Sequence, residues 1–164
     1  MAGVLLTVDD LHIGFRRDGA RLHPVRGVSL QVAPGECVAV VGESGCGKSL
    51  TALAIARLPP TDRAEVSGRI VLDGIDVSAG DAAALAQIRG RRVAYVFQDP
   101  AGSLNPVMRV GDQVAECLRA LPAAARRARV VDLLSKVGLP DPERQARAYP
   151  CEMSGGMQQR VMLA

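Results

Sequence analysis

The chain has 164 residues, of which 48% are hydrophobic and 23% are charged, as in folded globular domains and unlike disordered or collagen-like chains. Its formal net charge is +3, and the whole excess falls in residues 100–164, because residues 1–99 carry 11 basic and 11 acidic side chains. So small an excess argues against a nucleic-acid-binding groove. There is no long uncharged apolar stretch and no signal-peptide pattern at the start, so we expect a soluble, cytoplasmic chain.

Four cysteines occur at positions that form no C-x-x-C pair and no metal-binding spacing: Cys37, Cys46, Cys117 and Cys151. We therefore expect reduced and mostly buried thiols in a reducing compartment.

In chain order, the first part alternates short apolar runs with helical patterns. Strands are predicted at residues 4–8, 28–32, 38–41, 70–72 and 93–97, with a turn at Asp18–Gly19 between the first two. The run at 38–41 is typical of a buried parallel strand. Helices are predicted at 48–58, before Pro59 and Pro60, and at 81–89.

After residue 100 the pattern becomes helical. A loop is predicted at 101–107, followed by helices from Val110 to Leu121 and from Val130 to Val137. A third helix should begin near Ser154. Because that helix reaches the last residue without a stop signal, we expect the chain to be the front part of a longer protein.

Residues 42–49 fit the pattern G-x-x-x-x-G-K-S, between a predicted strand and a predicted helix. Glycines let backbone N–H groups turn inward around an anion, and the following helix adds its positive end. Lys48 would reach the β- and γ-phosphates, and the Ser49 hydroxyl would bind Mg²⁺. The chain contains no Asn-Lys-x-Asp motif, which disfavours a GTPase.

Two further segments narrow the class of phosphate-binding protein. They are residues 97–107, which read FQDPAGSLNPV, and residues 149–160, which read YPCEMSGGMQQR. Together with the phosphate loop they resemble the ABC transporter ATPases, and within these the oligopeptide, dipeptide and nickel importer branch. The resemblance implies an α/β P-loop NTPase fold of the ABC type. It implies a core sheet that is incomplete in this chain, a small antiparallel β part and an inserted helical subdomain. The expected domains are a nucleotide-binding core at 1–99 and a helical signature subdomain at 100–164.

The resemblance also implies the site. ATP would contact Phe15, which stacks on adenine in the family, and the loop residues Gly42, Glu43, Ser44, Gly45, Cys46, Gly47, Lys48, Ser49 and Leu50. Gln98 would contact Mg²⁺ and the attacking water, which makes Lys48 and Gln98 the expected catalytic residues and Ser49 and Gln98 the expected metal ligands. The signature residues Ser154, Gly155, Gly156 and Met157 would face the γ-phosphate of an ATP held by a partner ATPase subunit.

The implied protein energises import of short peptides or a similar solute at the cytoplasmic face of the inner membrane. Its partners would be membrane permease subunits, a second ATPase subunit, with a heterodimer favoured, and indirectly a solute-binding protein. No nucleic-acid partner is expected.

In the family, a strand ending in Asp-Glu follows the signature, and a His follows later in the chain. Neither is found in these residues, and both histidines, His12 and His23, precede the phosphate loop. We therefore expect the 164-residue chain alone to bind MgATP weakly without turnover. The alternative is a truncated, non-hydrolysing nucleotide-binding fragment or regulator. A DNA-repair ATPase of the chromosome-maintenance class is disfavoured, because 104 residues without sustained heptads separate Ser49 from Ser154.

Overall fold

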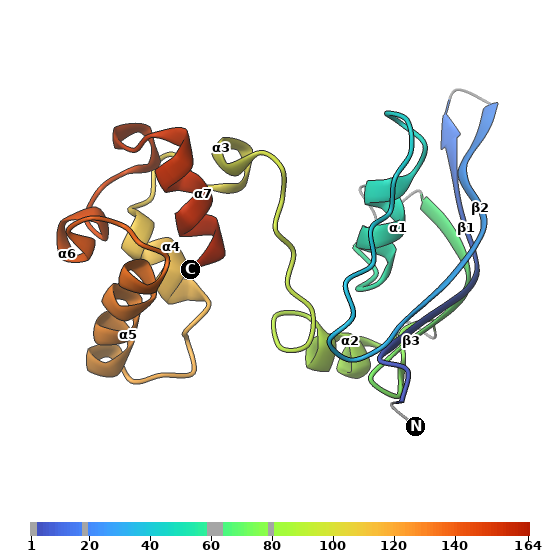
Figure 1. Cartoon of the computed structure of the whole chain (residues 1–164), viewed down its shortest axis with the longest axis horizontal. Helices are drawn as coiled ribbons and strands as arrows, with labels where there is room; N and C mark the ends of the chain where they lie inside the picture. Colours follow the sequence, from blue (N-terminus) through green and yellow to red (C-terminus); the bar gives the residue numbers. More distant parts are fainter. Residues whose placement is uncertain (1–2, 18–19, 59–63, 79–80) are drawn as a thin grey trace. The chain divides into compact units, whose positions relative to one another are not determined.

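The computed structural model describes residues 3–17, 20–58, 64–78 and 81–164. It divides into two compact units, residues 1–94 and residues 95–164. The first unit carries a four-stranded antiparallel sheet in the order β2-β1-β3-β4 (Figure 1). Its strands are β1 (Leu6–Arg17), β2 (Ala20–Val32), β3 (Ala64–Leu72) and β4 (Ile75–Asp76). The strands predicted at 28–32 and 70–72 lie within longer strands of this sheet, and the strand predicted at 4–8 begins at Leu6 and extends to Arg17. The turn predicted at Asp18–Gly19 lies outside the described residues.

A bulge near the middle of β1 sets which side chains of this strand are buried. Val8 is buried, the next buried residue is Leu11, and the pairing with β2 shifts register between them. Asp10 lies within the shift at φ +48°, and its backbone N–H donates to Ser29 Oγ at 2.9 Å. A Cβ at Gly68 of β3 would lie 2.4 Å from the Asp10 carbonyl oxygen, so glycine is required where β3 passes the bulge.

Helix α1 (Lys48–Ala54) lies against this sheet and is held at both ends. At its start, Thr51 Oγ1 donates to the carbonyl oxygen of Gly47 at 3.1 Å, and Thr51 is buried. After its end, Arg89 Nε donates to the carbonyl oxygen of Ala56 at 2.9 Å and so satisfies a terminal acceptor. The helix predicted for 48–58 is therefore shorter than expected, ending at Ala54.

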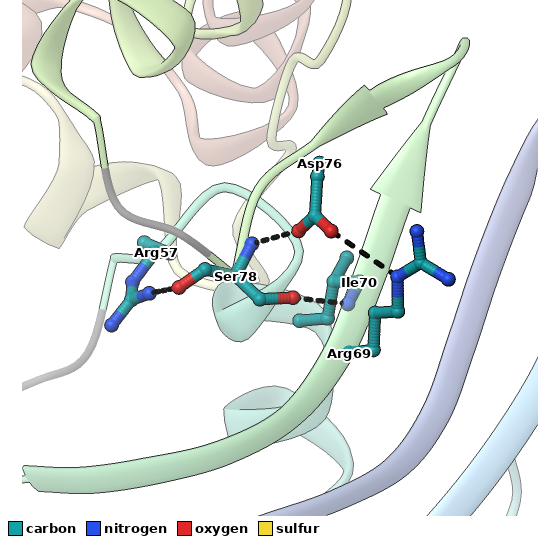
Figure 2. Close-up of polar contacts among 5 residues, drawn as sticks. All are labelled: Arg57, Arg69, Ile70, Asp76 and Ser78. Carbon is teal, nitrogen blue, oxygen red and sulfur yellow. Dashed lines mark hydrogen bonds and ion pairs between the residues drawn. The ribbon is translucent and has the colours of Figure 1, made fainter.

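A polar network fixes the segment that follows β4 (Figure 2). Ser78 Oγ accepts from the backbone N–H of Ile70 at 2.6 Å, and Ser78 N–H donates to Asp76 Oδ1 at 2.9 Å. The other Asp76 oxygen accepts from Arg69 Nε at 3.2 Å, and Arg57 donates to the Ser78 carbonyl. Hydrogen bonding, chiefly from Arg69, lowers the pKa of Asp76 below its ordinary value of 3.8.

The predictions of strands at 38–41 and 93–97 are wrong for this structure. Residues 38–41 form no regular secondary structure, and Val93 makes a single bridge to Arg89 without extending it. Val41 is 86% exposed and Val96 is 61% exposed. A buried parallel strand needs cover on both faces, and the exposure of Val41 and Val96 shows that neither segment has it.

Helix α2 (Ala82–Ile88) confirms the helix predicted at 81–89. Asp81 caps it by accepting from Ala83 N–H at 3.1 Å, and Ile88 is fully buried.

The second unit is helical, as predicted for residues after 100. Its elements are α3 (Pro100–Ser103), α4 (Val110–Glu116), α5 (Ala123–Lys136), α6 (Pro142–Gln145), a 3-10 turn (Pro150–Glu152) and α7 (Gly155–Leu163). Val110, Val114, Val130 and Leu134 supply part of its core, at the spacing that predicted two helices. The first of these helices ends at Glu116 rather than at Leu121.

The expectation of buried cysteines is wrong. Cys37, Cys46, Cys117 and Cys151 are all free and exposed. Cys37 and Cys46 lie in the segment without regular secondary structure before α1. Cys117 follows the end of α4, and Cys151 lies in the 3-10 turn. Less of the chain covers side chains at these positions. Among the described residues, none of the helices has the length and apolar character needed to cross a bilayer.

Candidate nucleotide-binding site

The phosphate loop lies between the unpaired segment 38–41 and the start of α1. Gly45 and Gly47 take φ values of +82° and +97°, which L residues with side chains rarely adopt. A Cβ on Gly47 would lie 2.8 Å from the carbonyl oxygen of Pro24 and 2.8 Å from Val25 Cγ2 in β2. Gly47 thus lets the loop bend tightly while the start of α1 rests against the sheet.

The side chain of Lys48 folds back across this loop. Its Nζ donates to the carbonyl oxygens of Gly42 at 2.9 Å and of Glu43 at 2.7 Å, and it lies 3.6 Å from Cys46 Sγ. The single positive charge of the loop is therefore held over its own backbone. A phosphate group is anionic, so its oxygens are stronger acceptors than a neutral carbonyl and can compete for the same ammonium group.

Ser49 and Leu50 follow Lys48 in the first turn of α1, and Ser49 is exposed. The described residues contain no group of three or more His, Cys, Asp or Glu side chains able to hold a metal ion. The exposed Ser49 hydroxyl and the open space beside Gly45, where a Cβ would meet no atom within 4 Å, fit a phosphate-bound Mg²⁺.

Phe15 belongs to the same unit as the loop and is half-buried on β1. It lies opposite Leu22 on β2 and Ala64 on β3. Leu22 is 53% exposed, so this end of the sheet presents apolar surface to a planar ring such as adenine.

Gln98 lies in the helical unit, and its side chain is exposed just before α3. Asp99 caps α3 by accepting from Ala101 N–H at 3.0 Å, and the Ser103 hydroxyl donates to the Asp99 carbonyl at 2.7 Å. The start of α3 thus fixes the backbone immediately after Gln98 while the glutamine side chain stays exposed.

Sequence reasoning missed Gln113, which organises the loop that follows α3. Its Nε2 donates to the carbonyl oxygens of Asn105 at 2.9 Å and Met108 at 2.8 Å, and its Oε1 accepts from Asn105 N–H at 2.9 Å. Asn105 Oδ1 in turn accepts from Val107 N–H at 3.1 Å. No motif marks Gln113, because a glutamine on a helix gives no sign of which backbone groups it will meet.

The signature segment forms the start of α7. Ser154 is the N-cap, and its hydroxyl oxygen accepts from Met157 N–H at 3.4 Å. A Cβ on Gly155 or on Gly156 would meet no atom within 4 Å, so both glycines face open space. Met157 is half-buried and packs against the core of this unit. Backbone N–H groups at an open helix start suit an anion supplied from outside.

The structure brings Gly42, Glu43 and Cys46 against the Lys48 side chain in the first unit, which also carries Phe15. Gln98 and the four signature residues belong to the second unit. A mixed α/β chain with a glycine-rich loop leading into a helix, followed by a helical unit with an open Ser-Gly-Gly turn, defines a P-loop NTPase of the ABC type.

Comparison with known proteins identifies the family. The ABC transporter family matches residues 25–164, which is most of the chain, and the chain belongs to this family. It is 47% identical over 165 residues to the oligopeptide transport ATP-binding protein OppD of Mycobacterium tuberculosis, and 42% identical over 164 residues to the dipeptide transport ATP-binding protein DppD of Bacillus subtilis. In both comparisons 98% of this chain is covered, but it spans 27% of the first relative's length and 49% of the second's.

Solved structures agree on the fold. The ATP-binding cassette MJ0796, in a dimeric post-hydrolysis state bound to ADP and Pi, superposes with a TM-score of 0.81 at 26% identity. That comparison covers 96% of this chain and 67% of MJ0796. The α/β fold of the ABC type and the peptide-importer branch predicted from the sequence are thereby confirmed.

Proposed function

We propose that the protein binds MgATP at residues 42–49 and energises the import of short peptides, or a similar solute, as the ATPase subunit of an ABC importer. The observation that carries this proposal is the Lys48 ammonium group, held 2.7 Å and 2.9 Å from two carbonyl oxygens of a loop that is open beside Gly45. The expected domains serve this role, with the nucleotide-binding core at 1–99 and the helical signature subdomain at 100–164.

Each residue of the loop has a defined part in this proposal. The backbone N–H groups from Gly42 to Leu50 surround the phosphates, and Lys48 exchanges its carbonyl partners for the β- and γ-phosphate oxygens. Ser49 and Gln98 hold Mg²⁺, which would supply charge neutralisation between the phosphates when bound. Phe15 provides the apolar ring that stacks on adenine, an interaction of about 1–3 kcal/mol by analogy with stacked nucleic-acid bases.

The signature turn acts on a second subunit. Ser154, Gly155, Gly156 and Met157 present an open helix start to the γ-phosphate of an ATP held by the partner's loop. Two chains would then enclose two ATP molecules, and we favour a pair of different subunits. The dimeric state of MJ0796 supports the pairing of two subunits, and the preference for different subunits stays a prediction.

The names of the relatives support the solute class. Oligopeptide and dipeptide transport ATP-binding proteins are similar to nearly the whole of this chain. By this proposal the protein works at the cytoplasmic face of the inner membrane, docked on permease subunits that receive solute from a solute-binding protein.

Hydrolysis requires more than a phosphate loop and a glutamine that contacts the metal. The 164 residues hold the loop and Gln98, but they contain neither the family's Asp-Glu strand after the signature nor a His beyond His23. We therefore expect the 164-residue chain alone to bind MgATP weakly without turnover. Sustained ATPase activity of that purified chain at the rate of the whole protein would contradict this expectation.

The test of ATP binding uses the two lysines of the chain, Lys48 and Lys136. Titration with a fluorescent ATP analogue should show at least a tenfold loss of affinity in Lys48→Ala, because a charge-assisted contact worth about 1.5–3 kcal/mol is removed. Lys136→Ala is the matched control, since Lys136 is exposed on α5 and pairs with Asp132 at 3.0 Å. Equal affinities of the two variants would overturn the proposed site.

A further inference from the structure

One carboxylate joins three strands at the end of the sheet that carries Phe15. Glu65, near the start of β3, accepts from Arg16 Nε of β1 at 2.9 Å through one oxygen. Its other oxygen accepts from the guanidinium of Arg21 of β2 at 3.1 Å. Arg16 and Arg21 are direct partners in the pairing of β1 with β2. These three side chains, Glu65, Arg16 and Arg21, therefore link β2, β1 and β3, and we call them the Glu65 bridge.

The Glu65 bridge and Phe15 lie on opposite faces of the sheet. Successive side chains of a strand alternate between the faces, and residues paired across strands share a face. Glu65 is the partner of Gly14, and Arg16 comes directly after Phe15, so the bridge occupies one face and Phe15 the other. The bridge can therefore act on Phe15 only through the backbone of the strands, without touching a bound nucleotide.

The face that carries Phe15 is also the face against which the phosphate loop rests. Ile13 precedes Phe15 on this face of β1, and its partner on β2 is Val25. A Cβ on Gly47 would lie 2.8 Å from Val25 Cγ2, which places the end of the loop against the same face. The ring expected to stack on adenine and the loop expected to hold the phosphates thus share one face of the sheet.

The strand pairing around Phe15 is interrupted on one side and ends on the other. Between Ile13 and Phe15, the pairing of β1 with β2 shifts register. Among the described residues, the pair of Phe15 with Ala64 is the last that β1 makes with β3. Strand ends open more readily than strand centres, because fewer hydrogen bonds and contacts hold them. The Glu65 bridge lies at this point, since its members come directly after Phe15 and directly after Ala64.

We propose that Glu65 is a positioning residue for adenine stacking, because it joins the ends of β1, β2 and β3 and so keeps Phe15 in place over the base. The inference rests on the proposed function and deepens it. The side chain of Glu65 is 47% exposed, and exposed ion pairs add little to the free energy of unfolding. Removing the bridge should therefore leave the fold intact and change mainly how the base is held.

The experiment measures binding of MgATP and of tripolyphosphate with Mg²⁺ to the 164-residue chain by isothermal titration calorimetry. Tripolyphosphate has the phosphates without the base, so its affinity reports on the loop alone. We expect ATP binding weaker by about threefold or more in Glu65→Ala, a part of the full stacking contribution, and unchanged binding of tripolyphosphate. Arg69→Gln is the matched control, because it breaks another exposed ion pair of the sheet, with Asp76 at 3.2 Å, and should leave both affinities unchanged.

A double-mutant cycle tests whether Glu65 acts through Phe15. If it does, Glu65→Ala should cause no further loss of ATP affinity in a chain that already carries Phe15→Ala. Circular dichroism checks that each variant is folded, and Arg21→Gln, which removes one contact of the bridge, keeps the test valid if Glu65→Ala unfolds. An equal loss of ATP and tripolyphosphate affinity, an undiminished loss in the Phe15→Ala chain, or an equal loss in Arg69→Gln would overturn the inference.

Failure of the proposed function gives a different result. A wild-type chain that binds neither ligand, or that binds both without dependence on Lys48, would overturn the proposed function and this inference with it. ATP binding that depends on Lys48 but is unchanged in Glu65→Ala, or unchanged in Phe15→Ala, would overturn only the positioning role of Glu65.

Discussion

The ammonium nitrogen of Lys48 lies 2.7 Å from the carbonyl oxygen of Glu43, within the loop that precedes its own helix. Lysine and loop therefore form one closed local unit. This contact holds the ammonium group at the loop but leaves it able to exchange partners, since a neutral carbonyl is a weaker partner than a phosphate oxygen.

Gly47→Ala should lower stability and ATP affinity by more than the strain of its backbone conformation alone would. Its φ of +97° strains any L side chain by about 1–2 kcal/mol, and its Cβ would also lie 2.8 Å from the Pro24 carbonyl oxygen. Gly35→Ala is the control, because Gly35 has φ +77° with no atom within 4 Å of a Cβ. Thermal denaturation and ATP-analogue titration should show both stability and affinity lower in Gly47→Ala than in Gly35→Ala. Equal effects would mean that the approach to β2 is unimportant.

Substitutions at Ser154 should separate its capping role from its anion-facing role. Ser154→Ala removes the acceptor for Met157 N–H and should destabilise the helical unit by about 0.5–2 kcal/mol. Ser154→Asp keeps a cap and should retain stability, but its negative charge would repel a partner-bound phosphate. In the whole protein, ATPase assays beside denaturant unfolding should show stable but strongly reduced activity in Ser154→Asp. Normal activity in that variant would argue against the signature contact.

Gln113→Ala should loosen the loop at residues 105–108. The substitution leaves three backbone groups of Asn105 and Met108 without their side-chain partner, at a cost of about 1–3 kcal/mol in unfolding free energy. Hydrogen exchange of the Asn105 amide should accelerate. Gln159→Ala, at an exposed position of α7, provides the control, and similar exchange in both variants would contradict the role of Gln113.

The lowered pKa of Asp76 predicts that the free energy of unfolding falls slightly in acid. Hydrogen bonds from Arg69 and Ser78 lower its pKa below 3.8, so its contribution is present above pH 3.8 and is lost as pH falls through the lower folded-state value. Because its side chain is 41% exposed, the contribution should be about 0.2–1 kcal/mol. Denaturant unfolding of the wild type and Asp76→Asn should converge at low pH. A constant difference between them across the acid range would contradict this contribution.

Local signals in the sequence predicted much of the fold. The start of α1 at Lys48, the Asp81 cap of α2 and the apolar spacing of α4 and α5 are all set within a few residues of the chain. The contact of Lys48 with phosphates stays a prediction, because the structure shows its ammonium group on the carbonyl oxygens of Gly42 and Glu43.

Features that depend on distant partners could not be predicted in this way. Residues 38–41 have the composition of a buried strand, yet burial depends on neighbouring chain that a local pattern does not specify. The exposure of Cys46 and the contacts of Gln113 likewise depend on how the chain closes around them.

The binding of MgATP at residues 42–49 is tested most directly by a crystal structure of the chain with a non-hydrolysable ATP analogue and Mg²⁺. We expect the phosphates within residues 42–49, with Lys48 Nζ moved from the Gly42 and Glu43 carbonyls to phosphate oxygens and with Ser49 on the metal. A loop that stays empty at saturating nucleotide, with Lys48 still bonded to its own backbone, would contradict it.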